Sequence, residues 1–430
     1  MGDQEQGATR AFVIHPDIKS AQRRRSAKDG LAEAIALAHA LPELEVLGGQ
    51  VVGLPKAQAG TLFGSGKIEE LHDQFHRDNV DLVLVDGPVT PVQQRNLEKA
   101  WEAKVLDRTG LILEIFSDRA RTREGVLQVE MAALTYQRTR LVRAWTHLER
   151  QRGGLGFVGG PGETQIEADR RAIDDQLTRL RRQLSKVVKT RELHRSARAK
   201  VPYPIVALVG YTNAGKSTLF NRMTGASVFA KDMLFATLDP TMRAVALPDG
   251  TDVILSDTVG FISDLPTELV ASFRATLEEV TAADLIVHVR DISHPETDVQ
   301  NEDVNTILEG LGIDDETPRM ELWNKADLLS PDNHETALNN AARRDDVYVT
   351  SALTGEGLDQ FLADVADQVT AAKKQATVTL DFADGKARAW LYDQGIVTAE
   401  TQTDTGLTVQ VDWTERQAQR FRQLGQGSIA

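Results

Sequence analysis

The sequence contains no cysteine among its 430 residues. This absence excludes disulfide bonds, thiol catalysis and cysteine-ligated zinc. Long apolar runs are also missing, since the longest, at Ile205–Gly210 and Leu285–Val289, fall far short of the roughly 20 residues that span a bilayer. The first 20 residues are polar, carry Asp3 and Glu5, and lack the pattern of a targeting signal. We therefore expect a cytoplasmic protein.

Negative charge dominates the composition, with 63 Asp and Glu against 49 Lys and Arg and a net charge of −14. The segment 131–200 departs from this balance, because it holds 16 Lys and Arg against 7 Asp and Glu. Such asymmetry is typical of an acidic protein with one basic, RNA-facing element. Long solvated helices are also rich in charge, so composition alone leaves both interpretations open.

Residues 11–125 alternate between strand-like and helix-like segments. Four apolar stretches are typical of buried strands: Ala11–Ile14, Leu44–Leu54, Val80–Gly87 and Lys104–Arg108. Between them, apolar residues recur at helical spacing. This alternation predicts a small parallel α/β sheet, which we assign to a first domain at 10–125.

The hydrophobic period changes after residue 125. One helical stripe continues to about Gln151, and a second, after a glycine-rich stretch, ends near Ala199. Val201–Pro204 (VPYP) stops the second helix, because proline cannot continue it. Two long stripes with a short connection predict an antiparallel helical hairpin at 126–200, with the glycine-rich segment 153–162 at its tip.

The segment Leu208–Thr218, LVGYTNAGKST, fits the pattern G-x-x-x-x-G-K-S of a phosphate-binding loop. It follows an apolar strand and precedes a helix, the context in which backbone N–H groups cradle phosphates. Lys216 is expected to contact the β- and γ-phosphates and Ser217 to ligate Mg²⁺. The motif predicts binding of a nucleoside triphosphate.

Three further motifs follow in the order of a guanine-nucleotide-binding domain. In DTVG, Asp257 can support the Mg²⁺ shell and the Gly260 amide can contact the γ-phosphate. In LWNKAD, the carboxylate of Asp327 can accept hydrogen bonds from both N1–H and the 2-amino group of guanine. In VTSAL, the N–H groups of Ser351 and Ala352 are candidates to bond guanine O6. Together these motifs predict a GTPase domain at 201–371.

The segment LFATLDPTMR contains the threonine that would complete Mg²⁺ coordination when the γ-phosphate is present. Thr237 is our assignment and Thr241 the alternative. Phe261 stands where Ras-type enzymes carry the glutamine that positions the attacking water, so intrinsic hydrolysis is expected to be slow and to depend on a partner or a cation. Asn213 is compatible with a K⁺ ion that replaces an arginine finger, and equally with a loop asparagine bonded to its own backbone.

The predicted nucleotide site groups these residues by role. The catalytic candidates are Lys216, Thr237 and Gly260. The candidate Mg²⁺ ligands are Ser217, Thr237 and Asp257. The residues predicted to contact GTP or GDP are Gly210, Tyr211, Thr212, Asn213, Ala214, Gly215, Lys216, Ser217, Thr218, Phe235, Ala236, Thr237, Leu238, Asp239, Asp257, Thr258, Val259, Gly260, Asn324, Lys325, Ala326, Asp327, Ser351, Ala352 and Leu353.

A second glycine-rich segment, GTLFGSGKIEE, invites comparison with a phosphate loop. Gly60 and Gly66 are separated by five residues instead of four, and Ile68 replaces the metal-binding Ser or Thr. A second triphosphate site around Gly64, Gly66 and Lys67 is therefore the less favoured hypothesis.

Several motifs spread along the chain resemble those of the HflX family of ribosome-associated GTPases. They include TLFGSGKIEEL, DRTGLILEIFSDRARTREGVLQVE, GGPGETQIEADRR, LFATLDPT and DTVGFI. The resemblance covers nearly the whole chain, and PGETQ ahead of the nucleotide motifs is highly specific. It implies a protein that binds the large ribosomal subunit, splits stalled or idle ribosomes under stress and hydrolyses GTP faster on the ribosome. It also implies a hairpin tip near the peptidyl-transferase centre, and an ATP-dependent activity is attributed to the family's N-terminal domain.

The resemblance gives the hairpin tip a role. Glycines keep side-chain bulk low, so the backbone can approach a crowded RNA surface. Arg152, Arg170 and Arg171 flank the glycine-rich segment and are expected to contact rRNA phosphates. Ribosomal proteins are further candidate partners, and we expect the chain to be a monomer.

The expected fold is an α/β multidomain chain. It comprises the small parallel α/β domain, the long antiparallel hairpin, a Ras-like P-loop GTPase domain and a small α+β domain at 375–430 with the order β-α-β-β-α. The leading functional hypothesis is a GTP-dependent switch that acts on the ribosome. Two alternatives stay open: a signalling GTPase whose hairpin docks a protein effector, and an ATP-driven RNA-remodelling activity of the N-terminal domain.

Overall fold

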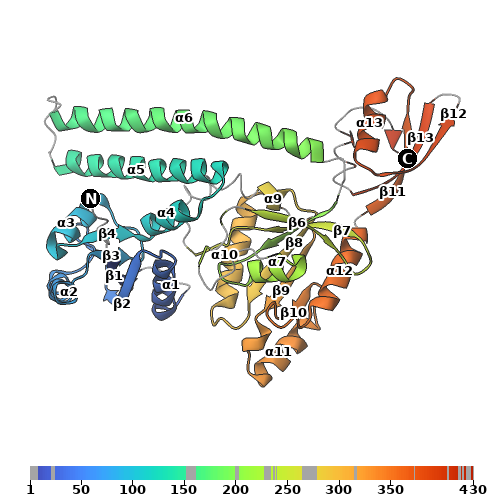
Figure 1. Cartoon of the computed structure of the whole chain (residues 1–430). Helices are drawn as coiled ribbons and strands as arrows, with labels where there is room; N and C mark the ends of the chain where they lie inside the picture. Colours follow the sequence, from blue (N-terminus) through green and yellow to red (C-terminus); the bar gives the residue numbers. More distant parts are fainter. Residues whose placement is uncertain are drawn as a thin grey trace, which may run out of the picture.

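The structure, a computed structural model, arranges the chain as three mixed α and β units and one helical hairpin (Figure 1). It describes residues 8–20, 25–151, 161–198, 203–226, 234–235, 238, 240–263, 278–313, 317–371, 373–403, 406–414, 418, 421–422 and 428–429. The predicted fold class is confirmed.

The N-terminal unit is a four-stranded sheet of order β2-β1-β3-β4 in which neighbouring strands are parallel. Its strands are β1 (Thr9–Ile18), β2 (Leu44–Leu54), β3 (Leu82–Val85) and β4 (Lys104–Asp107). One face packs on α1 (Ala27–His39) and α4 (Arg108–Arg119), the other on α2 (Ser65–Asp78) and α3 (Pro91–Trp101). The carboxyl ends of the strands share one edge, where polar side chains can converge.

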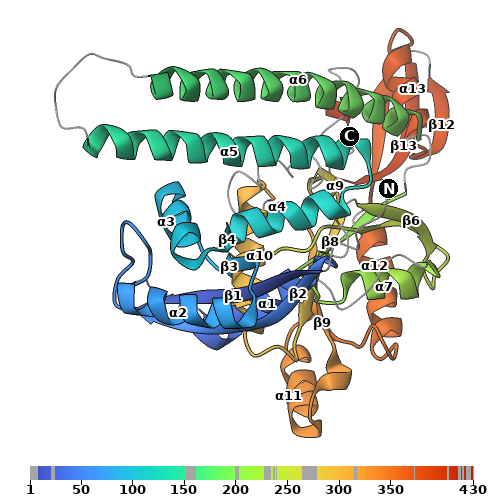
Figure 2. The ribbon, with the colours of Figure 1, turned by 60° about the vertical axis from the view of Figure 1, so that its left-hand side comes forward.

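The hairpin consists of α5 (Arg123–Gln151) and α6 (Pro161–Arg198), which run side by side past the N-terminal unit (Figures 1 and 2). Val129 and Ala132 of α5 and Leu177 and Leu180 of α6 are buried, as their helical spacing requires. Both helices are long but rich in charged residues. Among the helices in the described ranges, none is both long and apolar enough to cross a bilayer.

The third unit is a six-stranded sheet of order β10-β9-β8-β5-β7-β6, in which the pairs are parallel except for β6 with β7. Its strands are β5 (Ile205–Val209), β6 (Thr241–Ala246), β7 (Asp252–Asp257), β8 (Leu285–Asp291), β9 (Arg319–Asn324) and β10 (Val347–Val349). Its helices are α7 (Lys216–Thr224), α9 (Glu278–Thr281), α10 (Thr297–Gly310), η1 (Ala326–Leu328), α11 (Pro331–Ala341) and α12 (Leu358–Ala371). The sequence motifs predicted to bind nucleotide follow the carboxyl ends of β5, β7, β9 and β10.

The C-terminal unit is an antiparallel sheet of order β12-β13-β11-β14 with one helix packed against it. Its elements are β11 (Lys373–Leu380), α13 (Gly385–Asp393), β12 (Val397–Thr403), β13 (Gly406–Thr414) and β14 (Ser428–Ile429). The first four elements follow the expected order, and the short β14 was not expected. The expected last helix falls largely outside the described residues, although Ala418 and Phe421 are buried in this unit's core.

The N-terminal and third units share one apolar core. Buried side chains from β1, α1, α4 and α5 form a continuous cluster with Tyr211, Phe235 and Phe261 of the third unit. At the junction, the rings of Phe116 and Phe235 pack edge to face with centroids 4.7 Å apart. The two units are therefore held together by packing as well as by the connecting hairpin.

Candidate nucleotide site

The phosphate loop between β5 and α7 requires glycine at two positions. Gly210 has φ +147°, and a Cβ there would lie 2.2 Å from the carbonyl oxygen of Val289. Gly215 has φ +98°, and a Cβ there would lie 2.1 Å from Nδ2 of Asn324. A side chain at either position would clash and strain the backbone, which explains the spacing of the two glycines in the motif.

Lys216 begins α7 and points its ammonium group into the loop. The side chain is buried, and its Nζ donates to the carbonyl oxygens of Tyr211 at 2.7 Å and Gly210 at 3.1 Å. Burial lowers the pKa of Lys216 to about 8, against the opposing attraction of Asp257. Within the described residues, the hydrogen bonds of this buried ammonium go to neutral carbonyls, so an incoming phosphate would add a favourable charge interaction.

Ser217 and Asp257 place two oxygen atoms side by side that could ligate a metal ion. The hydroxyl of Ser217 donates to Oδ2 of the buried Asp257 at 2.7 Å. Hydroxyl and carboxylate oxygens are ligands that Mg²⁺ prefers, so the donor set present fits this ion. Thr241 begins β6 directly opposite Asp257 in the strand register, whereas Thr237 lies outside the described residues.

The segment after Asp257 lies against the phosphate loop. The N–H of Thr212 donates to the carbonyl of Phe261 at 2.7 Å, and the N–H of Phe261 donates to that of Gly210 at 3.0 Å. A Cβ on Gly260 would lie 3.0 Å from Nζ of Lys216. The Phe261 ring is buried in the shared core, so it takes no part in the polar surface of the loop.

Asn324 joins the phosphate loop to the loop that follows β10. Its Nδ2 donates to the carbonyl of Ala214 at 2.8 Å, and its Oδ1 accepts from the N–H of Ala352 at 2.8 Å. The hydroxyl of Ser351 donates to Oδ1 of the exposed Asp327 at 2.6 Å. The four motifs predicted from the sequence therefore converge on one surface.

Several predicted residues lie elsewhere or outside the described ranges. Phe235 and Leu238 are buried in the shared core. Arg170 and Arg171 are exposed on α6, near Asp174 and Glu167 respectively. Lys67 of the second glycine-rich segment is paired with Glu70. Ala236, Thr237, Asp239, Arg152 and residues 153–160 fall outside the described residues.

Known protein families match the units described above. Family models match four successive parts of the chain: a GTP-binding GTPase N-terminal region (28–117), its middle region (119–198), a 50S ribosome-binding GTPase (205–325) and an HflX C-terminal domain (336–430). A GTPase HflX from Magnetococcus marinus is 53% identical over 348 residues, which cover 81% of this chain and 79% of the relative. The chain belongs to the HflX family of GTPases.

Further comparisons concern a second relative and a solved structure. A GTPase HflX from Escherichia coli is 43% identical over 370 residues, covering 84% of this chain and 86% of the relative. A GTP-binding protein from Sulfolobus solfataricus, solved in complex with GDP, aligns with 84% of this chain and 99% of its own at 20% identity and a TM-score of 0.45. The two HflX relatives confirm the resemblance seen in the motifs, and the chain is a guanine-nucleotide-binding GTPase.

A polar cluster at the junction with the N-terminal unit was not predicted from the sequence. The hydroxyl of Tyr211, in the phosphate loop, donates to Glu33 of α1 and accepts from the N–H of Ser263 at 2.8 Å. Arg108 donates to Glu33 at 2.5 Å, to Asp86 at 2.6 Å and to the carbonyl of Ser263 at 3.0 Å. The N-terminal unit therefore contacts both the phosphate loop and the segment after DTVG.

The sequence carried one signal for this cluster, namely polar residues directly after two of the strands. Asp86 follows β3 and Arg108 follows β4, so both stand at the carboxyl edge of the parallel sheet where functional groups gather. Their partners Tyr211 and Ser263 come from a different unit, and no local pattern links them.

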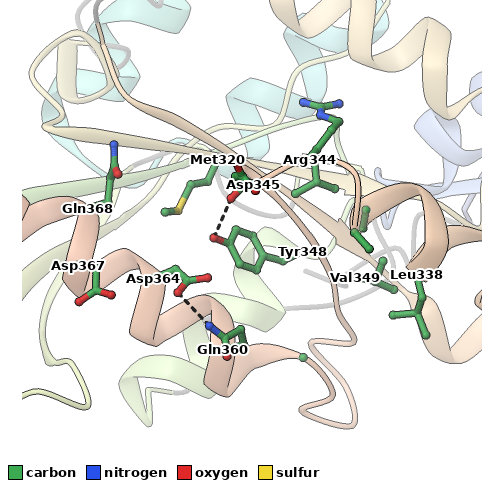
Figure 3. A pocket seen from close by; sticks show the side chains of 14 residues that line it. Met320, Leu338, Arg344, Asp345, Tyr348, Val349, Gln360, Asp364, Asp367 and Gln368 are labelled. Atoms are coloured by element: carbon green, nitrogen blue, oxygen red, sulfur yellow. Dashed lines mark hydrogen bonds between the residues drawn. The ribbon is translucent and has the colours of Figure 1, made fainter.

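A groove of about 700 Å³ lies at the β10 edge of the sheet of the third unit (Figure 3). It is bounded by α11, β10 and α12 and contains none of the residues predicted to bind nucleotide. Tyr348 projects into it between Asp345 and Asp364, and Gln360 donates to Asp364 at 2.9 Å. This groove is therefore separate from the nucleotide site.

Nucleotide binding is expected to weaken as the pH rises above about 8, where Lys216 loses its proton in protein that has bound no phosphate. A bound phosphate favours the charged ammonium and raises its pKa, so the complex holds the extra proton over this range. GDP affinity should therefore fall by up to about tenfold per pH unit above 8. Titration of fluorescent GDP between about pH 7 and 9 measures this, with Lys216→Arg, which stays charged throughout, as the matched control. An equally flat profile for both proteins would contradict the lowered pKa.

Proposed function

We propose that this GTPase is a ribosome-gated switch that binds the large ribosomal subunit in the cytoplasm as a monomer and splits stalled or idle ribosomes under stress. The observation that carries the proposal is the exposed basic surface of α6. Its exposed cations are Arg170, Arg171, Arg179, Arg181, Arg182, Lys186 and Lys189. The match of residues 205–325 to a 50S ribosome-binding GTPase supports the same partner.

The proposed nucleotide contacts come from the phosphate loop, the DTVG segment and the loop after β9. Lys216 binds the β- and γ-phosphates, the Gly260 amide contacts the γ-phosphate, and Asp327 accepts from the guanine base. Ser217, Asp257 and Thr237 would hold Mg²⁺, which would offset the negative charge of the phosphates. A K⁺ ion near the exposed side chain of Asn213 would supply charge that the site otherwise takes from a partner.

The switch itself rests on the contact between the DTVG segment and the phosphate loop. The backbone bonds of Phe261 to Gly210 and Thr212 place Gly260 beside the Lys216 ammonium. A γ-phosphate at that ammonium competes for this space, so the segment would shift until the Gly260 amide contacts the γ-phosphate. The triphosphate would hold the shifted segment in order, and the diphosphate would let it return. Because Ser263 also contacts Arg108, the displacement reaches the N-terminal unit.

Purified large ribosomal subunits are expected to raise GTP turnover by about tenfold or more, since the site lacks a glutamine at Phe261. Two variants locate the contact: one with residues 153–160 shortened, and one with Arg182 and Lys186 changed to Glu on α6. Both should lose stimulation while retaining basal turnover, and subunit binding should fall steeply with salt because phosphate contacts release counterions. Exchanging Glu309 for Gln on α10 serves as a charge-changing control.

Stimulation that persists in both variants would remove the hairpin from the interaction. Absence of any stimulation, with GDP binding intact, would favour a protein effector in place of the ribosome. Repeating the assay in KCl and NaCl tests the potassium hypothesis, because a K⁺-dependent site loses turnover in sodium while Asn213→Ala becomes indifferent to the exchange.

A further inference from the structure

Arg222, in the last turn of α7, donates to three consecutive backbone carbonyls. Its Nη2 lies 2.6 Å from the oxygen of Thr354, and its Nη1 lies 2.8 Å from that of Leu353 and 3.4 Å from that of Ala352. A guanidinium presents its donors in a rigid planar fork, so one side chain can hold a curved run of acceptors. The side chain itself is exposed, so its bonds do not arise from burial.

The loop is shaped around this guanidinium. Gly355 has φ +97°, and a Cβ there would lie 2.3 Å from Nη2 of Arg222. Two bonds curl the loop into this form: the N–H of Gly355 donates to the carbonyl of Ser351 at 2.8 Å, and that of Thr354 donates to the Ser351 hydroxyl at 3.1 Å. The carbonyls thus face Arg222 because the loop turns back on itself.

The other side of the same loop carries the groups that read the base. The N–H of Ala352, the candidate donor to guanine O6, donates to Oδ1 of Asn324 at 2.8 Å, so it would have to be shared between that oxygen and O6. Ser351 donates to Asp327, the candidate acceptor for N1–H and the 2-amino group. Movement of the loop would therefore change the O6 donor directly, whereas the backbone of Asp327 is held separately in η1 after β9.

We propose that Arg222 is a positioning residue for guanine recognition, which holds the loop 351–355 so that the Ala352 N–H, which donates to Oδ1 of Asn324, lies where it can be shared with O6 of the base. The inference rests on the guanine contacts proposed above. Arg222 does not touch the nucleotide in this scheme. It links the two ends of the site, because α7 begins with Lys216 and Ser217 at the phosphates and ends at the loop that reads the base.

Three nucleotides separate this role from a general loss of stability. Inosine diphosphate (IDP) lacks the 2-amino group that Asp327 reads but retains O6. 6-Thioguanosine diphosphate retains N1–H and the 2-amino group but replaces O6 by sulfur, a weaker acceptor. The ratio of GDP to 6-thio-GDP affinity therefore reports the Ala352 donor, and the ratio of GDP to IDP affinity reports Asp327.

In the full chain, Arg222→Ala is expected to weaken GDP binding about tenfold, since charge-assisted bonds to the loop are lost. The preference for GDP over 6-thio-GDP should fall by a similar factor, while the preference over IDP stays unchanged. Arg222→Lys, which keeps the charge without the fork, should be intermediate. Arg388→Ala, which removes an exposed arginine paired with Glu400 in the C-terminal unit, should change neither ratio.

Two results would overturn the proposal: an unchanged GDP to 6-thio-GDP preference in Arg222→Ala, or an equal fall of both preferences. Should the alanine variant fold poorly, the same ratios in Arg222→Lys decide the question. Failure of the guanine assignment itself has a different signature, namely Asp327→Asn leaving the wild-type preference for GDP over IDP intact.

Discussion

Replacing Arg108 by leucine is expected to loosen the junction between the N-terminal unit and the nucleotide site by about 3–5 kcal/mol. The substitution leaves two buried carboxylates, Glu33 and Asp86, without the guanidinium that they share. Burial alone would raise the pKa of Glu33, but Arg108 and Arg25 hold it below its ordinary value. Hydrogen–deuterium exchange at β1, β3 and residues 258–263 measures the local opening free energy.

The same substitution should raise basal GTP turnover several-fold. Arg108 holds the carbonyl of Ser263, so its loss frees the segment that lies against Lys216 to move toward the phosphates. Arg95→Ala, at an exposed position of α3, is the control and should leave both exchange and turnover unchanged. Unaltered exchange at 258–263 in the leucine variant would show that packing of Phe116 on Phe235 holds the junction without the ion pairs.

The pH dependence of this junction has a definite direction. The pKa of Asp86 is also lowered: burial opposes the shift, and the hydrogen bond from His15 and the charge of Arg108 outweigh it. A carboxylate whose pKa is lower in the folded state stabilises fully above its unfolded pKa of about 4 and loses that contribution as the pH falls further. Exchange measured near pH 7 therefore reports the junction with both carboxylates ionised.

The phosphate loop was predictable because its requirements are local. Gly210 and Gly215 each need space that only glycine leaves, and Lys216 and Ser217 follow at a fixed spacing on the next helix. The strands were predictable for a similar reason, since buried parallel strands appear as short continuous apolar runs. Family motifs then supplied the order of the units along the chain.

Long-range polar contacts were not predictable in this way. Tyr211 and Glu33 are 178 residues apart, and nothing near either residue indicates the other. The loop context predicted that Tyr211 contacts nucleotide, whereas the structure turns its hydroxyl to the N-terminal unit, where burial and the nearby Glu33 raise its pKa. Arg222 was equally hidden, because its acceptors are backbone carbonyls and carry no residue preference.

Asp327→Asn is expected to weaken GDP binding by about 10²-fold or more and to favour xanthosine diphosphate instead. The carboxylate accepts from both N1–H and the 2-amino group, whereas an amide turns a donor toward one of them. Xanthine carries an oxygen in place of that amino group and can accept from the amide. The Ser351 hydroxyl, which donates to the Asp327 carboxylate, can still donate to the amide oxygen of the substituted side chain, so the loop keeps its bond to η1.

Competition against fluorescent GDP and fluorescent xanthosine diphosphate measures this exchange of preference. Asp332→Asn, which removes an exposed charge from the first turn of α11, controls for the change in local charge and should retain the preference for GDP. Loss of GDP binding without any gain for the xanthine nucleotide would mean that Asp327 supports the loop through Ser351 more than it reads the base. A full exchange of preference would give a protein that no longer binds GTP, in which any hydrolysis of the xanthine nucleotide must come from this site.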